Sequence, residues 1–135
     1  MIEITNLTKQ KIGKSLIAEK VEQVLRGEKA KNWDISICLA TCAKIRELNK
    51  KFRGKNKSTD VLSFAELEVK GNKNKVGQII ICPIKVKENA KEFGRSFQEE
   101  LRHVLIHSVL HLLGYEHEKS QQDAEKMRKK EQAYS

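Results

Sequence analysis

The sequence predicts an α+β fold, a single domain over residues 1–135 in which a small mixed sheet of four strands packs against helices. Two observations predict this class. Apolar residues recur with the period of a strand and then of a helix, in the order strand, helix, strand, helix, two strands, helices. A chain of 135 residues with 39% hydrophobic residues and one proline is also long and apolar enough to bury one core.

The N-terminal half is expected to hold two pairs of a strand and a helix. A first strand covers residues 1–5, and a helix is expected within 7–27, with Thr8 as its candidate N-cap. The apolar stripe of this helix has helical spacing and consists of Leu16, Ile17, Val21, Val24 and Leu25. A second strand is expected over 33–40 and a second helix over 42–54.

The C-terminal half begins with a polar, basic loop, residues 53–60, and continues with a predicted hairpin. Its strands, over 61–69 and 76–83, are joined by the turn sequence "KGNKNK", so they should pair antiparallel. Before the following helices, Ser96 and Glu99 have the spacing of a capping box. The helices are expected over 83–94, 97–114 and 120–134.

The charge of the chain restricts the class of partner. A net charge of +9 favours contact with a polyanion such as nucleic acid or an anionic membrane, although a lysine-rich surface also serves solubility alone. No stretch approaches the about 18 apolar residues of a membrane span, and the N-terminus lacks the apolar core of a secretory signal. The three cysteines form no C-x-x-C pair and suit a reducing compartment. We therefore expect a cytoplasmic protein without a membrane partner.

Three of the four histidines lie in the stretch "HSVLHLLGYEH", residues 107–117. With about 3.6 residues per turn, His107 and His111 fall on one face of the expected helix, which is the usual helical clamp for a metal ion. Gly114 can end the helix and let the chain bring His117 back to the same point. Three imidazoles with an open fourth position are typical of a catalytic zinc site. The alternative is a core helix whose histidines are only hydrogen-bonded.

Two neighbouring residues refine this interpretation. His103 lies one turn before His107, and we expect it to stay outside the ligand set. Zincin metalloproteases carry H-E-x-x-H, in which the glutamate is the general base, whereas the residue after His107 is Ser108. A serine hydroxyl cannot take that role near neutral pH without a base of its own. The spacing therefore predicts a metal clamp without the base of a protease.

Three stretches have the order and spacing of known patterns. "HSVLHLLGYEH" is similar to H-G-x-L-H-L-x-G-Y-D-H. "LNKKFRGKNKSTDVLSF", residues 48–64, is similar to L-N-x-x-F/Y-R-G followed by P-T-D/N-V-L-S-F, and "GQIII", residues 77–81, to G-D-I-x-I. These patterns belong to the YbeY family of bacterial metal-dependent endoribonucleases of ribosomal RNA maturation, which the chain resembles over most of its length beyond residue 45. The departures, none at a proposed ligand, are Ser58, Gln78, Ser108 and Glu116.

The resemblance implies an α/β domain with a zincin-like metal-binding helix. It implies one divalent metal ion, and the ligands it implies are His107, His111 and His117. Zinc suits three imidazoles best, and nickel or copper would also bind them. No small-molecule cofactor is expected.

The resemblance also implies an activity, that of a single-strand-specific endoribonuclease in 16S rRNA maturation and ribosome biogenesis. Its partners would be single-stranded RNA, the 16S rRNA precursor and the small ribosomal subunit. Arg53 is implied as the catalytic arginine, and a guanidinium can hold a phosphate through two hydrogen bonds. Lys55 and Lys57 would bind RNA beside it, while water activated by the metal attacks the phosphodiester.

Some alternatives stay open. The general base could be Asp60 or Glu116, or the reaction could need none. The protein could instead be a non-catalytic, ribosome-associated RNA-binding protein with a structural metal. It could also be a zincin-like metallohydrolase that acts on another substrate.

Overall fold

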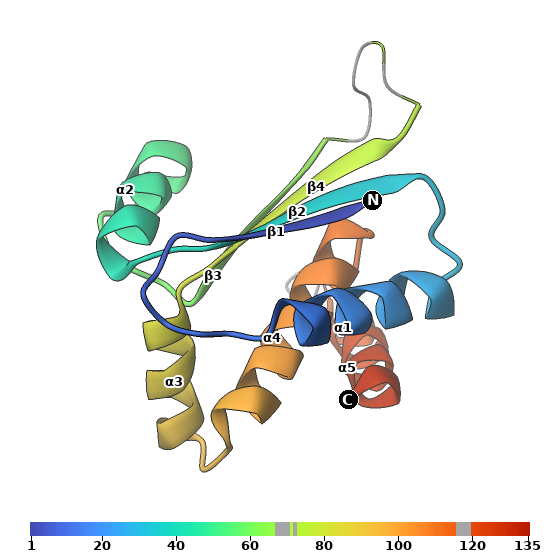
Figure 1. Ribbon diagram of the computed structural model, residues 1–135. Helices are drawn as coiled ribbons and strands as arrows, with labels where there is room; N and C mark the ends of the chain where they lie inside the picture. Colours follow the sequence, from blue (N-terminus) through green and yellow to red (C-terminus); the bar gives the residue numbers. More distant parts are fainter. Residues whose placement is uncertain (67–70, 72, 116–119) are drawn as a thin grey trace.

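The computed structural model describes residues 1–66, 71, 73–115 and 120–135 of the chain. They form one α+β domain in which a four-stranded sheet carries helices on both faces (Figure 1). The elements are β1 (Ile2–Asn6), α1 (Lys14–Gly27), β2 (Trp33–Leu39), α2 (Cys42–Arg53), β3 (Val61–Glu66), β4 (Lys75–Ile81), α3 (Pro83–Glu92), α4 (Phe97–Leu112) and α5 (Gln121–Tyr134). The predicted fold class, including its mixed sheet, is confirmed.

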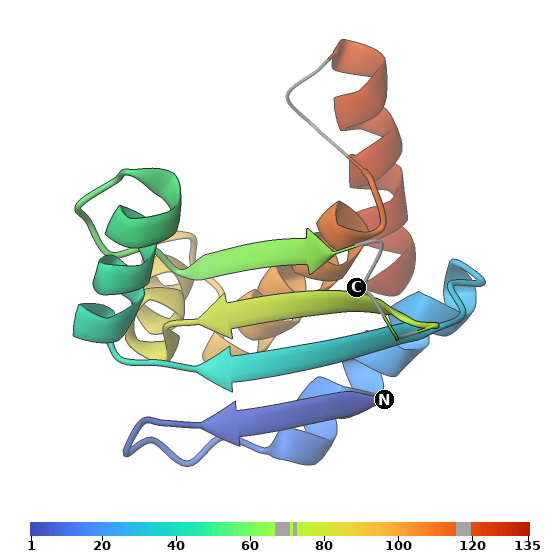
Figure 2. The same ribbon diagram turned by 90° about the horizontal axis from the view of Figure 1, so that it is seen from above.

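The sheet has the strand order β1-β2-β4-β3, which is visible from above in Figure 2. β1 and β2 are parallel, as are β2 and β4, and Ile35 of β2 lies between Ile2 and Gly77. β3 pairs antiparallel with β4, with Val61 opposite Ile81, as the hairpin prediction required. β3 is therefore an edge strand, and its outer side is available to contribute to a cleft.

Side chains alternate along the strands and supply two hydrophobic cores. The larger core joins Ile37 of β2 and Ile79 of β4 to α1 and α4, which lie on one side of the sheet (Figure 1). The smaller core holds Leu62 of β3 against Ile45 of α2 on the opposite side. Cys82 is buried in this second core, and all three cysteines are free thiols. Helices α2 and α4 thus approach the same edge strand from opposite faces.

Helix α4 is buried over most of its circumference. It begins with the predicted capping box, in which the Ser96 hydroxyl accepts from the Glu99 N–H and the Glu99 carboxylate accepts from the Ser96 N–H, both at 3.1 Å. The buried residues of the helix are Glu100, Leu101, Val104, Leu105, Ile106, Ser108, Val109, Leu110 and Leu112. After the helix, Gly114 adopts a φ of 102°, which favours glycine. In the described part of the chain, no helix combines the length and the apolar character needed to cross a bilayer.

The start of the first helix differs from the prediction. α1 begins at Lys14, with Gly13 at its N-cap, whereas the sequence analysis placed the helix within 7–27 with Thr8 as the cap. The Thr8 hydroxyl instead donates to the Asn6 side chain at 2.6 Å and accepts from the Gln10 N–H at 3.2 Å. Threonine competes for backbone partners in this way when a local turn is available, so the segment before α1 folds as a loop.

Helix α5 is held against the domain by its inner face and by a shared carboxylate. Met127 and Tyr134 are buried on this face, although the helix is otherwise polar. The carboxylate of Glu28, just after α1, accepts hydrogen bonds from the hydroxyls of Tyr115 and Tyr134, and Lys130 pairs with it at 3.3 Å. Burial and the bond to Glu28 raise the pKa of each tyrosine to about 12, so both hydroxyls remain donors near neutral pH.

We predict that Gly27→Ala loosens the attachment of α5. A Cβ at this position would lie 2.7 Å from the Cζ of Tyr134, whose ring is held by Glu28. The free energy of unfolding, measured by urea denaturation, should fall by about 1–3 kcal/mol, the usual cost of overpacking.

The matched control is Glu22→Ala at an exposed position of the same helix, which should change stability by less than about 0.5 kcal/mol. In a Tyr134→Ala background the Gly27→Ala change should be neutral or stabilising, because alanine favours a helix more than glycine does. An equal loss of stability in both backgrounds would show that Tyr134 is not the cause.

Candidate active site

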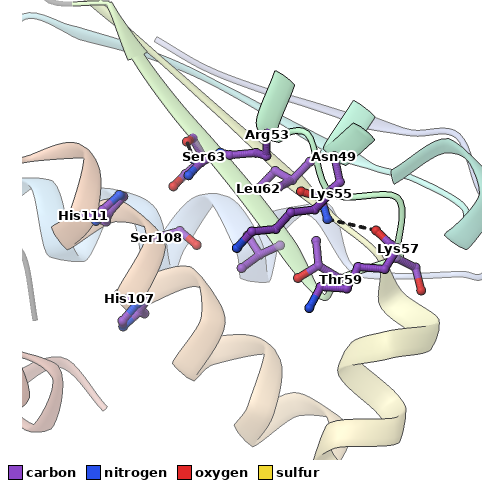
Figure 3. Close-up of a pocket in the computed structure, with 12 residues that line it drawn as sticks. Asn49, Arg53, Lys55, Lys57, Thr59, Leu62, Ser63, His107, Ser108 and His111 are labelled. Atoms are coloured by element: carbon purple, nitrogen blue, oxygen red, sulfur yellow. Dashed lines mark hydrogen bonds between the residues drawn. The ribbon is translucent and has the colours of Figure 1, made fainter. Parts of the chain in front are cut away.

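A cleft of about 590 Å³ lies between α4 on one side and α2, the following loop and β3 on the other. Figure 3 shows residues of these elements facing one another across it. Its lining consists of Asn49, Arg53, Lys55, Lys57, Ser58, Thr59, Val61, Leu62, Ser63, His107, Ser108 and His111. The cleft therefore brings together five residues that the sequence proposed from two separate motifs: Arg53, Lys55, Lys57, His107 and His111.

The α4 wall of the cleft carries two imidazoles. His107 and His111 lie on successive turns of the helix, as their spacing predicted, and both line the cleft (Figure 3). They are respectively half-buried and exposed, although the rest of α4 is largely buried. His103 has its ring 6.3 Å from that of His107, between centroids, and does not line the cleft. That it stays outside the ligand set remains a prediction.

Arg53 reaches the cleft from the opposite wall. It is the last residue of α2, and the chain turns directly after it because Gly54 adopts a left-handed φ of 69°. Its Nη2 donates a hydrogen bond to the carbonyl oxygen of Ser63 on β3 at 3.0 Å. Its Cζ also lies 5.3 Å from the centroid of the Phe64 ring. The guanidinium of this exposed arginine is therefore oriented by two neighbouring residues of the edge strand.

Asn49 holds the basic loop, and the sequence analysis did not assign it a role. It is only 3% exposed, and its Nδ2 donates to the carbonyl oxygen of Lys57 at 2.9 Å. The backbone carbonyl oxygen of Asn49 accepts a hydrogen bond from the Lys55 N–H at 3.3 Å. One buried residue thus fixes the backbone at both lysines. The signal in the sequence is its polar side chain on the helix face that otherwise carries Cys42, Ile45 and Leu48.

The cleft has a positive electrostatic character. Its lining includes Arg53, Lys55 and Lys57, and no carboxylate is present among the described lining residues. Asp60, a candidate base, lies outside the cleft wall, where its carboxylate accepts from Thr59 at 3.3 Å and from Asn89 of α3 at 3.4 Å. These contacts give Asp60 a role in anchoring the loop. An anion that enters the cleft meets cations on one side and imidazoles on the other.

A carboxylate of α5 contacts the Nδ1 atom of the His107 imidazole. Glu131 Oε1 lies 2.7 Å from His107 Nδ1, and the two residues are 24 positions apart. The Glu131 side chain is 17% exposed and the His107 side chain 33%. When His107 is neutral, this contact requires the proton on Nδ1, because a carboxylate can only accept.

The donor set fits a metal ion in part. The two cleft imidazoles are good ligands for zinc, and a carboxylate on the second nitrogen of a ligating histidine is the common arrangement at such sites. Within the described residues, no group of three or more His, Cys, Asp or Glu side chains is placed to hold a metal. The third expected ligand, His117, lies outside the described residues, as does Glu116. The residues present therefore fit two of the three proposed positions.

Ser108 lies in the α4 wall between the two histidines. It is 1% exposed, and its hydroxyl oxygen has no hydrogen-bond partner among the described residues. A proton acceptor that could activate this hydroxyl is therefore not in place in that part of the chain. The geometry agrees with the sequence argument that Ser108 does not replace the glutamate of a zincin protease.

Comparisons with known proteins show which family the chain is similar to. A family model described as "Endoribonuclease YbeY" matches residues 3–135. A protein of this name from Thermodesulfovibrio yellowstonii is 50% identical over 99 residues, which are 73% of this chain but 62%, less than two thirds, of that protein. A second, from Thermotoga maritima, is 37% identical over 118 residues, 87% of this chain and 75% of the relative. The solution structure of a Thermotoga maritima protein, 36% identical, superposes with a TM-score of 0.69 over 99% of this chain and 86% of that one.

The match of the family model spans both walls of the cleft, from the loop with Arg53 to the helix with His107 and His111. The relatives match at 36–50% identity, and the fold agrees with a solved structure over nearly the whole chain. From this agreement in sequence and fold, the chain belongs to the YbeY family.

Proposed function

We propose that the protein is a metal-dependent endoribonuclease that cleaves single-stranded RNA. The observation that carries the proposal is the cleft itself, in which Arg53, Lys55 and Lys57 face His107 and His111. Cations opposite potential metal ligands suit a phosphodiester better than a peptide or a sugar, because the phosphate is charged. The printed name of the relatives, Endoribonuclease YbeY, supports the same reaction.

In this proposal His107 and His111 hold one divalent ion together with His117, and zinc is the ion that their chemistry favours. When bound, the ion supplies a Lewis acid that activates water and offsets charge on the phosphoryl group. The two described histidines are presented by a buried helix. The ligands therefore need little rearrangement to bind, which is what a catalytic site requires.

Arg53 binds and orients the phosphate at the opposite wall. Its guanidinium is already oriented by the Ser63 carbonyl and the Phe64 ring, so little freedom is lost when a phosphate binds. Lys55 and Lys57 extend the positive surface along the loop that Asn49 anchors, and they would hold neighbouring phosphates of the strand. This arrangement also stabilises the extra negative charge of the transition state.

The biological substrate follows from the family resemblance. We propose that the protein acts on the 16S rRNA precursor, in contact with the small ribosomal subunit and in the cytoplasm. The net charge of +9 supports a polyanionic partner of this kind.

Two other functions are tested by the same assay. A non-catalytic RNA-binding protein would bind single-stranded RNA without cleaving it, and a peptide-directed metallohydrolase would leave RNA intact. The absence of a carboxylate from the described lining of the cleft disfavours the second. Incubation of a labelled single-stranded RNA with and without a chelator, beside metal analysis of the protein, separates the three.

Replacement of His111 by alanine should remove metal binding and RNA cleavage while the fold is retained. His111 is exposed, so its loss leaves no cavity in the core. Loss of a residue that hydrogen-bonds a metal ligand typically lowers metal affinity by about 10–100-fold, so loss of a ligand itself should lower zinc affinity by more than about 100-fold. Zinc content and cleavage of a labelled RNA measure the effect.

The matched control is His103→Ala, on the same helix but outside the cleft, which should retain both properties. Both variants must be purified identically to the wild type, because contaminating nucleases imitate weak activity. Full cleavage by a metal-free His111→Ala protein would contradict the mechanism.

Charge reversal at Arg53 should separate phosphate binding from metal binding. Arg53→Glu should bind zinc as the wild type does, while cleavage falls by at least about tenfold, since a charge-assisted hydrogen bond contributes about 1.5–3 kcal/mol. Single-turnover cleavage rates and zinc titration measure the two properties.

Arg46→Glu is the matched charge reversal, because Arg46 lies on the same helix, is exposed and pairs with Asn56 outside the cleft. It should lower cleavage much less than Arg53→Glu does. Normal cleavage by Arg53→Glu would exclude Arg53 from the chemistry.

A further inference from the structure

The inner face of α5 carries a carboxylate where an apolar residue is expected. Met127, Glu131 and Tyr134 follow the i, i+4, i+7 spacing of one helix face, and the first and last of them are buried. Glu131 lies between them with its side chain only 17% exposed. A sheltered carboxylate destabilises a protein unless it has a partner of matching chemistry. We therefore expect Glu131 to have a polar partner that accounts for a carboxylate on this face.

Glu131 contacts the imidazole of His107 across the interface of α5 and α4. The 2.7 Å separation of Oε1 and Nδ1 is that of a strong, charge-assisted hydrogen bond. By contrast, the ion pair of Glu125 with Arg128 lies on the exposed surface of α5 and joins residues three apart in one helix. The Glu131 bond instead joins two helices at a residue of the cleft wall.

We propose that Glu131 is a positioning residue that holds His107 as the Nδ1–H tautomer and turns its Nε2 toward the cleft. The inference rests on the proposed function, because it assigns the Nε2 atom to the metal. A neutral imidazole otherwise exchanges its proton between the two nitrogens, and the tautomer with hydrogen on Nε2 cannot bind a metal through that atom. The carboxylate removes this competing state and makes the remaining nitrogen a better ligand.

Helix α5 is thereby part of the active site, although none of its described residues lines the cleft. Burial of Met127 and Tyr134 sets the height and rotation of the helix, and so places Glu131 opposite His107. The bond of Tyr134 to Glu28 adds a second attachment at the end of α1. The rotation of α5 and the orientation of the histidine ring are therefore linked.

The first test reads the tautomer of His107 in the metal-free protein by long-range ¹H–¹⁵N NMR of the imidazole at a pH where the ring is neutral. The wild type should show the Nδ1–H form. Glu131→Ala should shift His107 toward the Nε2–H form, whereas Glu131→Gln, which keeps a carbonyl acceptor, should preserve Nδ1–H. Glu125→Ala, with the same charge change on the same helix, should match the wild type. An unchanged tautomer in Glu131→Ala overturns the proposal.

The second test is zinc affinity, measured by competition with a chromophoric chelator. Loss of the carboxylate in Glu131→Ala should weaken binding by about 10–100-fold, and Glu131→Gln should fall between that variant and the wild type. Glu125→Ala should bind zinc normally. Should Glu131→Ala prove unfolded by circular dichroism, Glu131→Met, which keeps the volume of the side chain but removes its oxygen acceptor, replaces it in both tests, and an unchanged tautomer in that variant overturns the proposal.

The two tests distinguish this proposal from the proposed function. A wild-type protein that binds no zinc and cleaves no RNA would refute the nuclease assignment, while the NMR result would still decide whether Glu131 sets the tautomer. A wild type that binds zinc and cleaves RNA, with Glu131→Ala indistinguishable from it, would refute only the role of Glu131.

Discussion

The burial of α4 is the constraint on which the rest of the structure depends. The helix packs its apolar residues against the sheet, α1, α3 and α5, and the stripe with His107 and His111 meets the cleft. A buried helix tolerates histidines only where their ring nitrogens find partners or solvent. The packing that stabilises the core therefore also determines the direction in which the imidazoles project.

The opposite wall depends on the other face of the sheet. α2 packs over β3 through the smaller core, and its last residue, Arg53, bonds the backbone of the same strand. β3 is an edge strand, and α4 packs against it from the opposite face, so both walls of the cleft are positioned relative to the same strand. The distance between cations and imidazoles is thus set by the sheet, while Asn49 fixes the loop that carries the lysines.

Features that depend on local spacing were predictable from the sequence. The four strands, the antiparallel hairpin, the capping box and the histidine face each follow from residues within one or two turns or strands of one another. The failure at Thr8 shows the limit of this method, since a turn with Asn6 competed with the helix start. Glu131 was not predictable, because its contact with His107 spans 24 residues and depends on how α5 packs.

The carboxylates around the cleft also bear on the proposed chemistry. Asp60 is bonded to Thr59 and Asn89, and Glu131 to His107, so each has a partner that orients it for a structural task. Neither lines the cleft, whose described walls offer cations and imidazoles. Within the described residues, the cleft therefore suits the binding of an anion better than the transfer of a proton to a carboxylate. This difference, together with Ser108 after the first histidine, separates the cleft from that of a zincin protease, in spite of the shared helical clamp.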